Sequence, residues 1–124
     1  MPYFNQDWKN MKIVVIDDEV DICFILGFEL KAIGHQTVSF HSALEAQKYL
    51  SSEDADAIIC DFQMPSMNGY ELFLWLKSQN KNIPFYILTG EPTMDSEDLI
   101  RSGIKKILYK PHDLIKIPSI FSQI

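Results

Sequence analysis

The sequence predicts an α/β protein in which helices cover both faces of a parallel sheet. Two observations support this prediction: short β-branched runs alternate with helix-like stretches, and three of the runs are almost entirely apolar. Such alternation favours parallel strands joined by crossover helices, and strands that are apolar throughout belong in a sheet with both faces covered. A length of 124 residues suits a single domain.

Each predicted strand is a short run that is followed by polar or charged residues. The five strands are expected at Lys12–Ile16, Gln36–Phe40, Ala57–Cys60, Pro84–Leu88 and Lys106–Tyr109. The stretches between them have helical character, and the expected helices are Val20–Ile33, Ser42–Ser51, Tyr70–Ser78, Asp95–Ser102 and a weaker one after Pro111. Residues 1–10 precede this alternation, so we expect an N-terminal extension followed by one domain over residues 11–124.

Local signals indicate where several helices begin and end. Ser42 and Asp95 are suitable N-cap residues, and Gly34 stands where a helix C-terminus favours glycine. Asn68 belongs to a predicted turn. An interior proline costs about 3 kcal/mol in a helix, so Pro118 predicts that the last helix is short or kinked.

Composition and charge exclude several classes of protein. Seventeen acidic residues against eleven basic ones give a net charge of −6, which argues against binding to nucleic acid or to an anionic membrane surface. No apolar run approaches the length of a membrane span, and no secretory signal is visible. The sequence therefore predicts a cytoplasmic protein.

The cysteines and histidines show no pattern of a metal site. Cys23 and Cys60 lie among apolar residues without CxxC spacing, so we expect reduced core cysteines. The three histidines, His35, His41 and His112, lack the spacing of metal ligands and are predicted to lie at the surface or in loops.

The residues that carry chemistry follow the predicted strands. Asp17, Asp18 and Glu19 come after the first strand, and single polar residues follow the third, fourth and fifth strands: Asp61, Thr89 and Lys110. Because parallel strands end at one edge of a sheet, these side chains should meet in one crevice. Carboxylates crowded together favour a divalent cation, and oxygen ligands alone favour Mg²⁺, Mn²⁺ or Ca²⁺.

Each of these residues also has an ordinary structural explanation. Asp17 and Asp18 could cap a helix, Asp61 could belong to a turn, Thr89 could bond locally, and Lys110 could be a solvated surface lysine. Taken together, these explanations require four independent coincidences at four neighbouring strand ends. The combination instead suits phosphoryl transfer to a carboxylate, with a metal and donor groups around the phosphoryl oxygens.

Four segments resemble the response regulator receiver domain of the CheY-like type, over about residues 11–117. They are IVVIDDE, IICDFQMPSMNGYEL, YILTG and ILYKP, in the family's order and at its usual separations. The resemblance implies a flavodoxin-like, doubly wound five-stranded parallel sheet of order 2-1-3-4-5. It also implies a cis Lys110–Pro111 bond.

The same resemblance implies roles for the residues at the strand ends. Asp61 would be the phospho-acceptor and Lys110 its charge partner. Asp17, Asp18, Asp61 and the main-chain carbonyl of Gln63 would surround Mg²⁺, with Mn²⁺ as an alternative. Thr89 and Tyr109 would occupy the two switch positions.

The implied mechanism is a phosphorylation switch. A sensor histidine kinase or a histidine phosphotransfer protein would present phosphohistidine, and the switch residues would then move to change the binding of a downstream protein. The domain would catalyse its own phosphorylation without turning over a free substrate. The sequence names neither the kinase nor the output, and it fits a stand-alone regulator as well as the receiver of a longer protein.

Some positions are distinctive for this chain. Gln63 and Glu91 lie two residues past Asp61 and Thr89, at positions that tune the decay of the phosphorylated form in the family, and Gly90 should leave room beside the site. The apolar Leu74 and Trp75 fall near the polar face of the third predicted helix. They could be covered by the aromatic residues of the N-terminal extension, Tyr3, Phe4 and Trp8, or they could form a patch for a partner.

Three other functions remain open at this point. A phosphate-ester hydrolase of the haloacid dehalogenase kind would need DxD after the first strand, whereas this chain has adjacent Asp17 and Asp18. A flavin nucleotide binder would need a loop rich in Gly, Ser or Thr there instead of acids. A receiver fold that only docks partners would not need the complete acceptor site.

Overall fold

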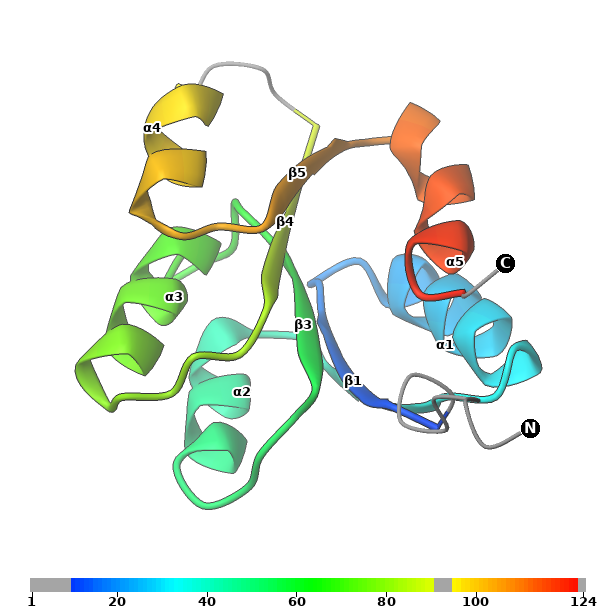
Figure 1. The fold of residues 1–124 in the computed structure, drawn as a ribbon, viewed down its shortest axis with the longest axis horizontal. Coiled ribbons are helices and arrows are strands. Elements are labelled where there is room, and N and C mark those ends of the chain that lie inside the picture. Colours follow the sequence, from blue (N-terminus) through cyan, green and yellow to red (C-terminus); the bar gives the residue numbers. More distant parts are fainter. Residues whose placement is uncertain (1–9, 91–94, 123–124) are drawn as a thin grey trace, which may run out of the picture.

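The computed structural model describes residues 10–90 and 95–122. Five parallel strands form one sheet, as the alternation predicts, in the order β2-β1-β3-β4-β5 that the resemblance implies (Figure 1). Their bounds are β1 Lys12–Ile16, β2 Gln36–Phe40, β3 Ala57–Asp61, β4 Phe85–Thr89 and β5 Lys106–Tyr109.

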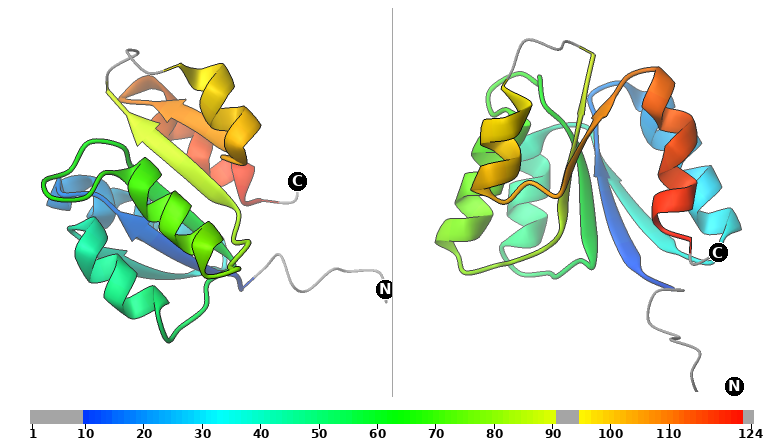
Figure 2. Two further views of the ribbon diagram at one scale, coloured as in Figure 1. Left: turned by 90° about the vertical axis from the view of Figure 1, so that its left-hand side faces the viewer. Right: turned by 45° about the horizontal axis from the view of Figure 1, so that its top comes forward.

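Helices cover both faces of the sheet, which confirms the predicted three-layer arrangement. Figures 1 and 2 show α1 and α5 on one face and α2, α3 and α4 on the other. The helices are α1 Val20–Ala32, α2 Ala43–Leu50, α3 Gly69–Ser78, α4 Ser96–Ser102 and α5 Ile117–Ile120, with a 3₁₀ helix, η2, at His112–Lys116.

Side chains that alternate along the strands divide the core into two halves. In β1, Val14 and Ile16 pack toward α2 and α3, whereas Ile13 and Val15 pack toward α1 and α5. Every residue of β3 and β4 is buried. The edge strand β2 is only partly buried, so the apolar central strands mark the middle of the sheet.

The helix ends largely follow the sequence signals. Ser42 Oγ accepts a hydrogen bond from Glu45 N at 3.1 Å, and the Asp95 carboxylate accepts from the amides at the start of α4. Asn68 does more than form a turn, because it and Glu71 make a reciprocal capping box that begins α3.

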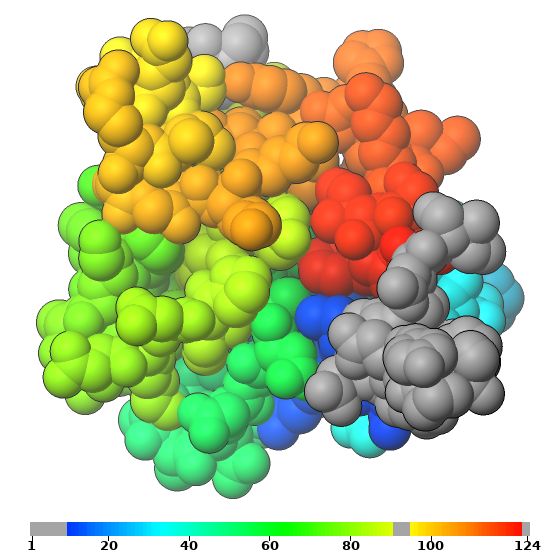
Figure 3. Space-filling view, in the orientation of Figure 1, coloured from blue at the N-terminus to red at the C-terminus, as the bar shows by residue number. Residues whose placement is uncertain are grey.

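The C-terminal segment packs onto the body of the molecule (Figure 3), burying Ile117 and Phe121. A 3₁₀ helix ends at Lys116 and the one-turn helix α5 follows. Pro118 lies in the first turn of α5, where the missing N–H breaks no helical hydrogen bond. The prediction of a short or kinked last helix is confirmed.

His35 lies in the loop between α1 and β2, so the predicted loop position is confirmed, but its side chain is buried and not at the surface. This side chain is 4% exposed, its Nδ1 accepts a hydrogen bond from Met11 N at 3.1 Å, and its Nε2 lies 2.7 Å from the Phe121 carbonyl oxygen. It joins the start of β1 to the C-terminal segment, a contact that spacing along the sequence does not show. The cysteines, by contrast, are free and buried as expected.

On α3, Leu74 is 45% exposed and Trp75 is half-buried against the core. The three aromatic residues proposed to cover them lie outside the described residues, as does most of the predicted extension. Among the helices that the structure describes, none is long and apolar enough to cross a membrane.

Candidate functional site

The sheet brings the predicted polar residues to its carboxyl edge. Asp61 is the last residue of β3, and Asp17 follows β1 directly. Ile16 pairs with Cys60 across these neighbouring strands, so the next residues along each strand are these two aspartates. Asp17 N also donates a hydrogen bond to the Phe40 carbonyl oxygen at 3.0 Å, which holds the chain after β1 against β2.

Three carboxylates form a compact cluster at this edge. One oxygen each from Asp17, Asp18 and Asp61 lies within 4.8 Å of the others. Asp17 and Asp61 are buried and Asp18 is exposed. Buried like charges at this separation repel one another, whereas a hard divalent cation takes oxygen ligands of this type. The donor set therefore fits Mg²⁺.

Lys110 places its ammonium among these acids. Its Nζ lies 2.8 Å from Asp17 Oδ2, 3.4 Å from Asp61 Oδ1 and 3.9 Å from Glu19 Oε2. Burial alone would lower the Lys110 pKa, but the hydrogen bond and charge of Asp17, with the charges of the other two acids, raise it overall. The lysine therefore stays protonated beside the cluster.

The carboxyl group of Asp61 has an unusual environment. Burial, followed by the neighbouring charge of Asp17, raises its pKa to about 6, although Lys110 acts in the opposite direction. Its side chain is 9% exposed. Asp61 is thus a partly accessible carboxylate that remains ionised near neutral pH.

The two predicted switch residues pair across β4 and β5. Thr89 ends β4 and is 1% exposed, and it stands in register with the partly exposed Tyr109. Lys110 N donates to the Thr89 carbonyl oxygen at 2.8 Å, and the Lys110–Pro111 bond is cis as expected. Tyr109 N donates to Asp113 Oδ2 at 2.8 Å.

Two of the remaining predicted positions, Gln63 and Gly90, lie around this edge. Gln63 is exposed two residues past Asp61. Gly90 is exposed, and a side-chain carbon there would meet no atom of the described part of the chain within 4 Å. This agrees with the expected room beside the site. Glu91 lies outside the described residues.

Sequence reasoning missed a residue that supports the site. A Cβ at Gly69 would lie 2.6 Å from the Asp61 carbonyl oxygen, and Gly69 N donates to the Phe62 carbonyl oxygen at 2.9 Å. Only glycine lets the first turn of α3 approach the end of β3 so closely. The Asn68–Glu71 spacing is the pattern of a capping box, although only a turn was predicted there, and no sequence signal indicated this close approach.

Comparison with known proteins identifies the family. The model of the response regulator receiver domain matches residues 13–121. The chain belongs to this family. This favours the receiver over the phosphate-ester hydrolase and the flavin binder.

One curated relative and two solved structures illustrate the similarity of this receiver to known proteins. The transcriptional regulatory protein ZraR of Klebsiella oxytoca is 28% identical over 93% of this chain and 26% of its own length. The receiver domain of Francisella response regulator 1452 is 28% identical, with a TM-score of 0.79 over 90% of this chain and 96% of that one. The response regulator TrrA of Thermotoga maritima, solved in complex with Mg²⁺-BeF, shares the fold at 24% identity and a TM-score of 0.78, over 89% of this chain and 95% of that one.

The receiver described here spans about a quarter of the length of the curated relative ZraR.

Proposed function

We propose that Asp61 accepts a phosphoryl group from a phosphohistidine on a sensor histidine kinase or a histidine phosphotransfer protein. The observation that carries this proposal is the placement of Asp61 at the carboxyl edge of the sheet, within 4.8 Å of two other carboxylates and 3.4 Å from the Lys110 ammonium. Carboxylates that can hold a divalent cation, beside an ammonium, suit the transfer of a negatively charged phosphoryl group to one of them.

In the proposed step an Asp61 carboxylate oxygen attacks phosphorus. An O–P bond forms as the P–N bond to the donor imidazole breaks, and the ring nitrogen leaves with the electron pair. Lys110 Nζ would donate to one phosphoryl oxygen and the Thr89 hydroxyl to another. The chain catalyses this transfer to itself, so no turnover of a free substrate is proposed.

A divalent cation completes the proposed site. Asp17, Asp18, Asp61 and the main-chain carbonyl of Gln63 would hold Mg²⁺, and Mn²⁺ prefers similar oxygen ligands. When bound, the cation offsets charge on the phosphoryl oxygens. The Lys110 ammonium, 2.8 Å from Asp17 Oδ2, offsets part of the negative charge of the cluster as well.

Thr89 and Tyr109 are proposed to transmit the modification. A new bond from the Thr89 hydroxyl to the phosphoryl group would draw this side chain toward Asp61 and free space for the Tyr109 ring. Because the two residues pair in adjacent strands, movement of one changes the packing of the other. Such local electrostatic changes bias a two-state element.

The proposed output is altered binding of a downstream protein by the receiver domain of residues 11–124. Its net charge of −6 does not favour direct contact with nucleic acid. We propose that the reaction takes place in the cytoplasm, as the sequence predicts.

The proposal is tested by intact-mass measurement after incubation with acetyl phosphate and Mg²⁺. The parent protein should gain one phosphoryl group, and Asp61→Asn should gain none. Asp54→Asn is a matched control, because Asp54 is an exposed acid outside the site, and it should behave as the parent. An equal gain in the parent and in Asp61→Asn would contradict the assignment of the acceptor.

A further inference from the structure

Helix α1 exposes a row of large apolar side chains, here called the α1 ridge. Val20, Phe24 and Phe28 follow one another at intervals of four residues, so they lie along one face of the helix. They are 61%, 73% and 70% exposed. Single exposed apolar residues are common, but a contiguous row of this size marks an interaction surface.

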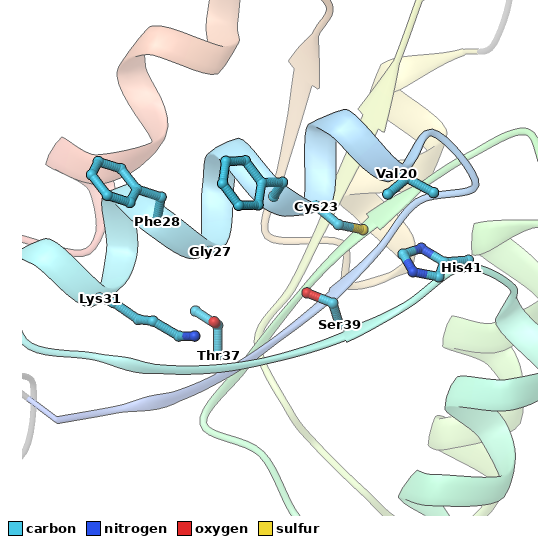
Figure 4. A pocket seen from close by; sticks show the side chains of 9 residues that line it. Val20, Cys23, Gly27, Phe28, Lys31, Thr37, Ser39 and His41 are labelled. Carbon is cyan, nitrogen blue, oxygen red and sulfur yellow. The ribbon is translucent and has the colours of Figure 1, made fainter.

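A groove of about 450 Å³ lies beside this ridge. Figure 4 shows Phe28 and Lys31 projecting from α1, with Thr37 and Ser39 on the neighbouring edge strand β2. Gly27 leaves the groove open, because a side-chain carbon there would crowd Thr37 Oγ1 at 3.3 Å. The same face of the molecule therefore has a protruding apolar ridge and, beside it, a largely apolar groove.

Charges of opposite sign stand near the two ends of the same helix. Asp21 is exposed in the first turn of α1, and Lys31 is exposed in the last turn. Within residues 10–90 and 95–122, neither residue takes part in an ion pair. The face is therefore self-complementary in charge when a second helix of the same sequence runs in the opposite direction.

We infer that this face of α1 docks a second copy of the chain about a two-fold axis. With the axis between Phe24 and Phe28, antiparallel helices place Phe24 against the partner's Phe28 and Asp21 beside the partner's Lys31. Symmetry makes each contact twice, as in isologous dimers. The two ridges cover each other, and each enters the groove of the other copy.

This inference is independent of phosphorylation. The ridge residues are exposed in the protein described here, so the surface is present without any modification. The dimer is accordingly expected for the unmodified chain, and its failure would leave the proposed reaction of Asp61 untouched.

Sedimentation velocity of the unmodified full chain, from low micromolar to near millimolar concentration, tests the inference. The chain should pass from 14.3 kDa to twice that mass. Phe24→Glu should weaken dimerisation about a hundredfold or more, because it replaces buried aromatic area with charge. Ile115→Glu is the matched control: Ile115 is 82% exposed on η2 and belongs to neither the ridge nor the groove lining, so the variant should dimerise as the parent does.

Charge reversal tests the antiparallel register. Asp21→Lys should weaken dimerisation roughly tenfold, since two attractive pairs become repulsive. Adding Lys31→Asp should restore it. Failure of the double variant to recover would overturn the proposed register.

Two other outcomes would overturn the proposal. A parent that stays monomeric throughout the concentration range has no such interface. A parent that becomes dimeric only after deletion of residues 1–9 would show that the chain's own N-terminal residues occupy the surface.

Discussion

Asp61 shows how neighbouring residues set the chemistry of one carboxyl group. Burial disfavours its ionisation most, the like charge of Asp17 acts in the same direction, and the ammonium of Lys110 favours ionisation. The sequence predicted that these residue types would meet, because each follows a strand. It could not predict that Lys110 lies closer to Asp17 than to Asp61, since that depends on side-chain packing at the edge of the sheet.

The raised pKa of Asp61 predicts the stability of the Asp61→Asn variant at different pH values. The folded pKa is about 6, above the unfolded value of about 3.9, so the folded state holds the proton more tightly. The resulting stabilisation is complete below about pH 4 and is lost as pH rises through about 6. Above about pH 6 the folded parent contains a buried, ionised Asp61 carboxylate, and the Asp61→Asn variant lacks this charge.

In buffer with a metal chelator, Asp61→Asn should therefore be more stable than the parent at pH 8, by on the order of 1 kcal/mol. The difference should shrink as the pH falls toward 4. Urea unfolding at several pH values measures it. A difference that does not change with pH would show that Asp61 titrates alike in the folded and unfolded chain.

Gln63 is predicted to affect the lifetime of the phosphorylated form. It is exposed two residues past the acceptor, where its amide could orient an attacking water. Gln63→Ala should change the decay rate of phosphorylated Asp61 more than the rate at which it forms. Gln36→Ala, an exposed position on the edge strand β2, is the control, and equal decay in the parent and in Gln63→Ala would refute this role.

The start of α3 is the element that most closely supports the acceptor. Asn68 and Glu71 cap the helix, and Gly69 brings its first turn against the Asp61 main chain. The capping pattern is visible in the sequence. The need for glycine is not, because it arises only when β3 and α3 meet in three dimensions.

Gly69→Ala is predicted to destabilise the fold. Its Cβ would stand 2.6 Å from the Asp61 carbonyl oxygen, so the backbone must shift; such overpacking typically costs about 1–3 kcal/mol. Phosphorylation by acetyl phosphate should slow as Asp61 moves. Both effects are measured by urea midpoint and by intact mass.

Gly90→Ala is the matched comparison, because among residues 10–90 and 95–122 no atom lies within 4 Å of the added carbon. It should unfold at a urea concentration close to that of the parent. If the two glycine variants were equally stable, the close approach at Gly69 would have no structural importance.

At the scale of the whole molecule, the sequence predicted the alternating strands and helices but missed features that depend on contacts in three dimensions. The alternation of apolar runs and helices predicted a parallel sheet with helices on both faces, the resemblance to receiver domains implied the strand order, and the strand ends predicted the site. Buried His35 was missed because its partner carbonyl belongs to Phe121, 86 residues away. The exposed α1 ridge was missed because Val20–Ala32 is apolar on most sides, so its spacing does not distinguish the core face from the surface.

The central claim is that Asp61 alone receives the phosphoryl group, and chemical localisation tests it most directly. The chain is incubated with acetyl phosphate and Mg²⁺, quenched and reduced with borohydride, which converts an aspartyl phosphate to homoserine. Tandem mass spectrometry then finds the converted position. The account predicts conversion at position 61, with Asp17 and Asp18 unchanged, whereas conversion at position 17 or 18 with Asp61 intact would contradict it.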